Sequence, residues 1–224
     1  RQRVLRRHYR PRKRSRLEPN GTDRHNAYAR RFQKDRGRLP CVGSFESAET
    51  SERRGGQPGK IDAPLDKKLQ AVKWGKFRLG DLFESSNGDF DIQKNHINGK
   101  GEFVITAGLS HNGIFGKTDV PAKIFNAKTI TIDMFGNAFY RQFKYKIVTH
   151  ARVFSLKPLF NLTDSQGLFF SITLHFLHFY FGYENMCSWE KIKDFDIQLP
   201  LTPTSEIDFD FMESFIRELE EERI

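Results

Sequence analysis

The stretch from residue 166 to residue 183 most constrains the fold, because it leaves hardly any polar face. A membrane-spanning helix needs about 20 apolar residues. This stretch is shorter, and it carries His175 and His178. We therefore expect a helix that is buried on most sides and that ends near Gly182. Its apolar residues are Leu168, Phe169, Phe170, Ile172, Leu174, Phe176, Leu177, Phe179, Tyr180 and Phe181.

Segments that favour strands surround this helix in the sequence. They are residues 102–106, 129–134, 138–141 and 145–156. The second of them alternates polar and apolar residues, which is the period of a half-buried strand. Two pairs that tolerate a positive φ, Asn112-Gly113 and Gly136-Asn137, predict turns. The predicted fold is α+β: a mixed, twisted β-sheet packed on a buried apolar helix and followed by a projecting coiled-coil-type helix.

The C-terminal segment predicts this last helix. Thr204 or Ser205 is expected to cap it, and Asp208 and Asp210 favour its positive end. A seam at four-three-four spacing suits a partner helix and consists of Met212, Ile216, Leu219 and Arg223. Glutamates crowd the negative end of the helix, where they are unfavourable. We therefore expect the helix to be truncated here and to continue in a longer chain.

Positive charge is concentrated at the N-terminus. Residues 1–60 hold 18 Lys/Arg and 6 Asp/Glu, a net charge of +12, whereas residues 61–224 hold 19 and 22, a net charge of −3. We interpret 1–60 as a disordered basic arm, either non-native or adding sequence-independent phosphate contacts. Residues 61–73 are expected to be a short linker or helix, 74–203 the folded domain, and 204–224 the start of a spacer or dimerisation helix. The high overall charge therefore does not by itself make the folded domain a nucleic-acid binder.

The sequence lacks the patterns that several kinds of enzyme chemistry require. There is no Asn/Asp-Pro-Pro-aromatic tetrad of an amino-methyltransferase, no dinucleotide fingerprint around Gly99 and Gly101, and no complete phosphate-cradling loop. His175, His178 and Cys187 offer three zinc ligands, but packed histidines are the simpler interpretation, so we expect no metal. Two cysteines are too few for a disulfide scaffold and suit the cytoplasm.

Three polar, cationic loops are candidates for reading DNA. Arg and Lys match guanine or anchor phosphates, Asn and Gln match adenine, and such side chains must project from a rigid scaffold. Arg141 and Lys144 are expected to anchor phosphates, and Asn112 and Gln142 to reach bases. The alternative is that these are solvated loop residues and turn formers. The candidates are Lys94, Asn95, His96, Lys100, Ser110, His111, Asn112, Lys117, Asn137, Tyr140, Arg141, Gln142 and Lys144.

Four segments, in this order and spacing, carry a resemblance to a known family. They are residues 74–83 (WGKFRLGDLF), 104–116 (VITAGLSHNGIFG), 129–140 (TITIDMFGNAFY) and 197–200 (IQLP). Together they resemble a target-recognition domain of the specificity subunit of a restriction–modification enzyme, of type I or the fused type II variety. The resemblance implies a non-catalytic reader of one half-site in double-stranded DNA, with residues 74–203 as the recognition domain.

The resemblance also implies partners. These are methyltransferase and endonuclease subunits or domains, and a second recognition domain held through paired helices. Magnesium, ATP and the methyl donor would belong to those partners, and no membrane is involved. Three alternatives stay open. The chain may be read as the recognition portion of a single-chain methyltransferase–endonuclease, as a helical subunit-assembly module, or as a protein that coats nucleic acid through its basic arm.

Overall fold

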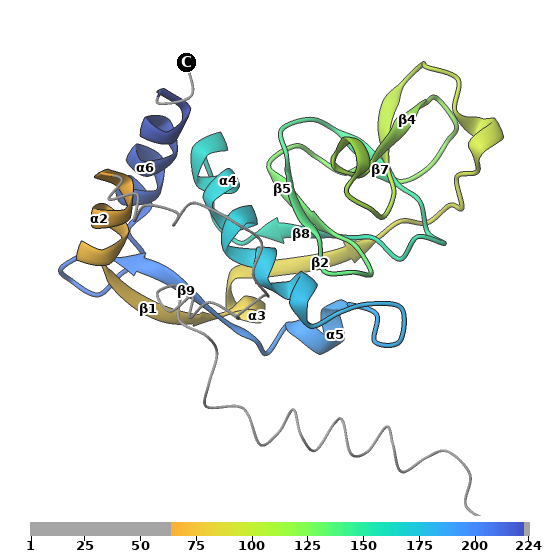
Figure 1. Ribbon diagram of the computed structural model, residues 1–224. Helices are drawn as coiled ribbons and strands as arrows, with labels where there is room; N and C mark the ends of the chain where they lie inside the picture. The colour runs from red at the N-terminus through yellow and green to blue at the C-terminus, as the bar shows by residue number, and fades with distance from the viewer. Residues whose placement is uncertain (1–63, 222–224) are drawn as a thin grey trace, which may run out of the picture. The chain divides into compact units, whose positions relative to one another are not determined.

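The computed structural model describes residues 64–221, so the expected arm, Arg223 and the end of the last helix lie outside the described residues. Helices and strands follow the chain in an α+β order (Figure 1). They are α2 (Pro64–Ala71), β1 (Lys73–Arg78), α3 (Leu79–Leu82), β2 (Phe83–Asn87), η1 (Lys94–His96), β3 (Glu102–Ile105), η2 (Ser110–Gly113), β4 (Ile114–Thr118), β5 (Thr129–Ile132), β6 (Ala138–Arg141), β7 (Tyr145–Ile147), β8 (Phe154–Pro158), α4 (Asp164–Thr173), η3 (Leu174–Phe179), α5 (Trp189–Ile192), β9 (Asp196–Leu201) and α6 (Phe209–Glu221). The α+β class is confirmed, and the segment expected to be a short linker or helix contains α2.

The strands form three sheets rather than the single mixed sheet that was expected. Strands β1 and β9 pair, β2-β8-β5-β6 form an antiparallel sheet, and β4-β3-β7 form a sheet in which β3 and β7 are parallel. The predicted strand 145–156 is broken by a turn in which the amide of Arg152 donates to the oxygen of Thr149 at 3.0 Å. Arg152 has a φ of 52°. Because of this turn, β7 and β8 join different sheets.

The apolar stretch is a helix followed by a tighter coil. The hydroxyl of Thr163 accepts from the amide of Gln166, which caps α4, and α4 gives way to the 3-10 helix η3 after Thr173. Phe170 is fully buried, whereas Phe179 on η3 is 74% exposed. The prediction of a buried helix therefore holds for α4 but not for one helix reaching residue 183. No helix within residues 64–221 is both long and apolar enough to cross a membrane.

Two separate apolar clusters hold the described residues together. The first, the helical core, gathers buried residues of α4, α6, β5, β8 and β9 with aromatic rings at its centre. Within it the ring of Phe170 lies 5.7 Å from those of Phe83 and Phe160. The second, the hairpin core, lies under the β4-β3-β7 sheet. It consists of Ile92, Val104, Ile105, Phe125, Tyr145, Ile147, Val148, Ala151 and Val153.

Helix α6 differs from its prediction at its start and along its seam. It begins at Phe209, and the carboxylate of Asp208 caps it by accepting from the amide of Phe211 at 2.8 Å, so Thr204 and Ser205 are not its caps. Its seam faces the helical core, because α4 and β9 already occupy that side of α6. Met212 and Ile216 are buried and Leu219 is partly buried there. These three residues, which were expected to meet a partner helix, contact the domain's own core in this structure.

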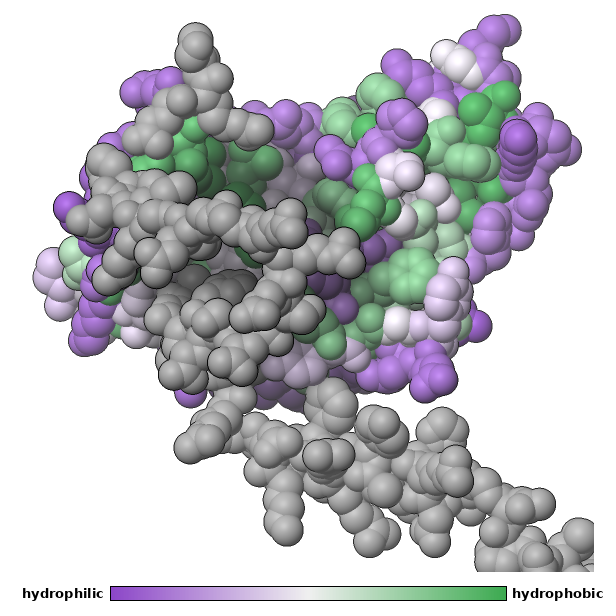
Figure 2. Space-filling view, viewed as in Figure 1, coloured by the Kyte–Doolittle hydropathy of each residue, from purple (hydrophilic) through white to green (hydrophobic). Residues whose placement is uncertain are grey.

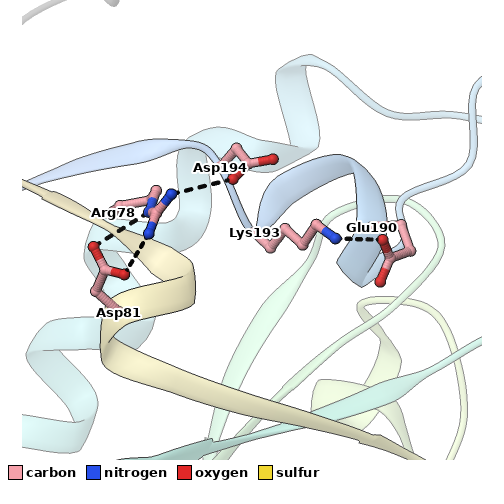
Figure 3. Close-up of polar contacts among 5 residues, drawn as sticks. All are labelled: Arg78, Asp81, Glu190, Lys193 and Asp194. Atoms are coloured by element: carbon pink, nitrogen blue, oxygen red, sulfur yellow. Dashed lines mark hydrogen bonds and ion pairs between the residues drawn. The ribbon is translucent and has the colours of Figure 1, made fainter.

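The beginning and the end of the domain are joined by main-chain hydrogen bonds. The amide of Gly80 in α3 donates to the oxygen of Lys193 at 2.7 Å, beside the β1–β9 pair. Ion pairs on the surface surround this contact (Figure 3). They join Arg78 to Asp81 and Asp194, and Lys193 to Glu190, and the hydrogen bond to Asp81 raises the pKa of Arg78. These pairs are exposed and contribute little stability, so the backbone bonds and the packing hold this junction.

Candidate nucleic-acid interface

One end of the β3–β4 hairpin gathers most of the predicted cations. The amides of Asn98 and Gly99 donate to the oxygen of Lys117 at 3.1 and 3.2 Å, which places the loop that contains η1 beside the end of β4. Phe143 reaches the same place, because its ring lies 4.4 Å from that of Phe103. We call this group the cationic end. Its predicted contact residues are Lys94, Asn95, His96, Lys100, Lys117, Gln142 and Lys144.

Aromatic rings support the cations at this end. Phe103 pairs with Lys117 across β3 and β4, and the ammonium of Lys117 lies 4.4 Å from the centre of the Phe103 ring. The face of an aromatic ring attracts an ammonium group electrostatically, which limits the motion of the lysine. Gln142 and Lys144 flank Phe143 in sequence and are exposed. The cationic end therefore combines exposed amides with cations near partly buried rings.

The opposite end of the same hairpin is a tight turn, which we call the Leu109–Asn112 turn. The amide of Asn112 donates to the oxygen of Leu109 at 3.0 Å. His111 and Asn112 have φ values of 50° and 53°, and Ser110, His111 and Asn112 are exposed. Gly113, at φ 73°, closes the turn, because a side-chain carbon there would lie 2.7 Å from the oxygen of Thr106. The predicted turn at Asn112-Gly113 is confirmed.

The two ends are spaced suitably for contacting one DNA groove. Strand β3, which separates them, has 4 residues, and at a rise of about 3.3 Å per residue it spans roughly 13 Å. The major groove of B-DNA is about 12 Å wide. The predicted contact residues therefore form two groups at the ends of one short hairpin, not one continuous tip.

Three predicted contact residues are buried, which corrects their expected role. The side-chain amide of Asn137 donates to Asp133 at 3.0 Å, and the hydroxyl of Tyr140 donates to Asp164 at 2.9 Å. Burial raises the pKa of Tyr140. Arg141 is only 2% exposed, and burial lowers its pKa to about 10. Because these side chains point into the domain, the expectation that they contact bases or phosphates is not met in this structure.

Tyr140 is buried by a close helix contact. A side-chain carbon at Gly167 of α4 would lie 2.1 Å from the Tyr140 ring, so only glycine lets the helix approach β6 this closely. The glycine interrupts an otherwise bulky helix face, which was the only sequence signal for this contact. Tyr140 therefore anchors the antiparallel sheet to α4.

A buried carboxylate that the sequence analysis overlooked organises the neighbouring turn. Asp133 follows β5 and accepts from the amides of Phe135 and Asn137 at 2.9 and 3.0 Å. It also accepts from the amide of Gly108 at 2.8 Å, which lies just before the Leu109–Asn112 turn. An Asp placed two residues before a Phe-Gly-Asn sequence is typical of a side chain that bonds the backbone of its own turn. That pattern was the available signal for it.

Charge is divided unevenly along the described chain. Residues 94–157 hold ten Lys/Arg and three Asp/Glu, a net charge of +7. Residues 158–221 hold three and twelve, a net charge of −9. Of the ten cations only Arg141 and Lys146 are buried. Figure 2 shows hydrophilic residues along the outer edge of the part of the domain that contains β4 and β7. Residues 94–157, which contain the β4-β3-β7 sheet, are therefore the cationic part of the domain, and residues 158–221 are its acidic part.

The described residues show no grouping that could hold a metal ion. No three His, Cys, Asp or Glu side chains come together within residues 64–221. His178 bonds the main-chain oxygen of His175. Cys187 is buried, which raises its pKa to about 12, so its thiol stays protonated. The exposed chemistry of this surface is therefore hydrogen bonding and positive charge.

This α+β domain has a short hairpin whose loops carry cations and amides. These features define a binding domain whose contact surface is made of loops. Residues 71–224 match the family model of the type I restriction modification DNA specificity domain, and the chain belongs to this family. The family expected from the sequence is thereby confirmed. Comparison with curated protein sequences gives no match.

Two of the solved structures that this chain is similar to are the following. One is the S subunit of a type I restriction–modification system from M. genitalium, with 16% identity and a TM-score of 0.48 over 70% of this chain and 41% of that chain. The other is the HsdS subunit from Thermoanaerobacter tengcongensis, with 16% identity and a TM-score of 0.47 over 75% of this chain and 39% of that chain. This chain thus spans about two fifths of the length of either protein.

Proposed function

We propose that this chain reads one half-site of double-stranded DNA for a restriction–modification complex. The observation that carries the proposal is the net charge of +7 on residues 94–157, with lysines beside exposed amides at the cationic end and exposed His111 and Asn112 at the other end of the β3–β4 hairpin. Lysines at the cationic end would contact phosphates, which gives affinity without sequence preference. Asn112, Gln142 and His111 would reach base edges, which gives discrimination.

The chemistry of restriction and modification is assigned here to partners. Methyltransferase and endonuclease subunits, or domains of a longer fused chain, would bind magnesium, ATP and the methyl donor. A second recognition domain linked through paired helices belongs to the same proposal. Because the seam of α6 is buried, such pairing would use the exposed side of α6, which holds Arg217, Glu220 and Glu221. The chain itself would contribute recognition only.

Selection from random DNA duplexes tests this function directly. The full chain should enrich one short sequence, and its affinity for the enriched duplex should fall with salt. A slope of about −0.9 in log K against log salt is expected for each phosphate contact. A protein that enriches no sequence, or whose affinity does not respond to salt, is not a half-site reader.

A truncated protein separates this function from binding through the basic N-terminal segment. A protein that lacks residues 1–60 should enrich the same sequence as the full chain, because the proposed contacts lie in residues 94–144. Its affinity should fall by the same factor for every duplex if the removed cations contributed phosphate contacts. Loss of all binding in the shorter protein would instead assign DNA binding to the N-terminal segment.

A further inference from the structure

The Leu109–Asn112 turn is held from two sides by buried charged side chains. Asp133 accepts from the amide of Gly108 at 2.8 Å, on the side where the chain enters the turn. Arg141 donates through Nη2 to the main-chain oxygen of Asn112 at 2.7 Å, on the side where it leaves. Both side chains are at most 3% exposed. Neither of them belongs to the turn itself, since both lie on or beside the β5–β6 hairpin.

The buried guanidinium of Arg141 donates its hydrogen bonds to uncharged oxygens. Its Nε donates to the hydroxyl of Thr131 at 2.9 Å, and its guanidinium lies 5.2 Å from the centre of the Phe139 ring. Burial of a cation is costly unless its donors are satisfied. A planar guanidinium can serve both oxygens at fixed angles, which a lysine ammonium cannot do equally well. The guanidinium therefore fixes the position of Asn112 relative to the rigid sheet.

We call Asp133 and Arg141 together the clamp. The Leu109–Asn112 turn that the clamp holds is strained and exposed. His111 and Asn112 both have positive φ values without being glycine, a conformation that persists where the surrounding structure over-determines it. Leu109 is 64% exposed, although it is a large apolar residue. Exposed side chains on an ordered turn lose little freedom when they bind, which favours discrimination between closely similar partners.

We propose that Asp133 and Arg141 are positioning residues that set the base specificity of the Leu109–Asn112 turn without touching DNA. This inference rests on the proposed function of half-site recognition. It reverses the role that sequence alone suggested for Arg141, which was an anchor for phosphates. A phosphate anchor changes the salt dependence of binding, whereas a positioning residue changes the choice of base.

Two buried substitutions and one exposed control separate these roles. In Arg141→Lys the charge stays but the two-pronged hydrogen bonding is lost. Thr131→Val removes the acceptor of Arg141 Nε, and with it the longer bond that the Thr131 hydroxyl donates to the oxygen of Phe139 at 3.4 Å, at a position that is 1% exposed. The preference is the ratio of affinities for the enriched duplex and for duplexes with one changed base pair. In both variants this ratio should fall by about tenfold. Their salt slope should equal that of the unmodified protein.

The control is Lys144→Ala at the exposed cationic end. It should reduce the magnitude of the salt slope by about 0.9 and leave the ranking of duplexes unchanged. Fluorescence anisotropy at two salt concentrations with the full chain measures both quantities. Thermal unfolding of each variant shows that the measurements are made on folded protein.

Three outcomes decide the inference. Unchanged base preference in folded Thr131→Val and Arg141→Lys overturns it, and so does an Arg141→Gln variant whose salt slope falls as that of Lys144→Ala does. If the Arg141 variants do not fold, Thr131→Val and Asp133→Asn decide alone. Loss of base preference in either variant supports the inference, and unchanged base preference in both refutes it. An unmodified protein that enriches no sequence refutes the proposed function itself, which is a distinguishable result.

Discussion

The helical core and the hairpin core differ in size and in what they carry. The helical core buries 23 residues around stacked and edge-on aromatic rings, whereas the hairpin core buries nine. Since hydrophobic stabilisation grows with buried apolar area, the first core must supply most of the stability of the domain. The second carries the cationic end and the Leu109–Asn112 turn, but Asp133 and Arg141 tie that turn to the β5–β6 hairpin, whose buried apolar residues belong to the first. The cationic end therefore stands on the part of the domain that is less strongly held.

The largest effect is expected from Phe170→Ala in the helical core. Phe170 is fully buried and touches the rings of Phe83 and Phe160, so its loss leaves a cavity in the middle of the aromatic cluster. Removal of such a ring costs about 3–5 kcal/mol. Urea unfolding followed by circular dichroism should show this loss for the entire domain.

A matched aromatic substitution provides the control. Phe179 lies on the adjoining coil but is mostly exposed, and a surface substitution usually changes stability by less than about 0.5 kcal/mol. If Phe170→Ala and Phe179→Ala unfold at the same urea concentration, the helical core is not the main source of stability.

The second prediction concerns the seam of α6, which the sequence assigned to a partner. Met212 is fully buried against the domain's own core. Met212→Ala should therefore destabilise the protein by about 2–5 kcal/mol, without changing its mass in solution. Light scattering and thermal unfolding measure the two quantities. A change of mass at unchanged stability would restore the seam to an interface between chains.

Local patterns in the sequence identified elements well but could not assign the neighbours of each element. The predicted strand 138–141 coincides with β6, and the predicted turn at Asn112-Gly113 is present. The turn between β5 and β6 lies at residues 134–135, and of the predicted pair Gly136-Asn137 only Gly136 has a positive φ. An apolar helix and an amphipathic helix were also predicted. Periodicity shows that one face of α6 is apolar, but it does not show whether α4 or another chain covers that face. That choice depends on the connection through β9, which no local pattern records.

The candidate site shows the same limit in its side chains. Arg141 and Lys144 are both cations near the end of the same hairpin, and sequence gives them the same role. The structure buries the first and exposes the second. What separates them is the position of Thr131 and Asn112 relative to β6, a three-dimensional relation. Likewise, the φ of 52° at Arg152, which divides one predicted strand into two, has no glycine to announce it.

The third prediction contrasts two asparagines to which the sequence gave one role. Asn112 is exposed on the hairpin, and Asn112→Ala should cost about 1–3 kcal/mol of discrimination at one base pair. Its stability should fall by no more than about 1 kcal/mol, because alanine tolerates the φ of 53° at this position less well than asparagine does. Competition binding with singly substituted duplexes, together with thermal unfolding, tests both statements.

Asn137 is the internal comparison for that variant. It is buried and donates to Asp133, so Asn137→Ala removes one of the donors to a buried carboxylate, which keeps its bond from the amide of Gly108. Loss of a hydrogen bond to a charged group costs about 1.5–3 kcal/mol of stability. Asn137→Ala should therefore lower stability more than Asn112→Ala does. Equal losses of stability in the two variants would contradict the different roles that the structure gives to the buried and the exposed asparagine.

The smallest effect tests whether the two cores unfold separately. Ile105 is fully buried in the hairpin core, and Ile105→Val should cost about 0.5–1.5 kcal/mol. If the hairpin sheet opens on its own, amide hydrogen exchange should accelerate in β3, β4 and β7 and stay unchanged in α4 and α6. Ile130→Val in the helical core, also fully buried, is the matched variant and should accelerate exchange throughout the domain. Uniform acceleration by both variants would show one cooperative unit, and the binding loops would then be as firmly held as the helices.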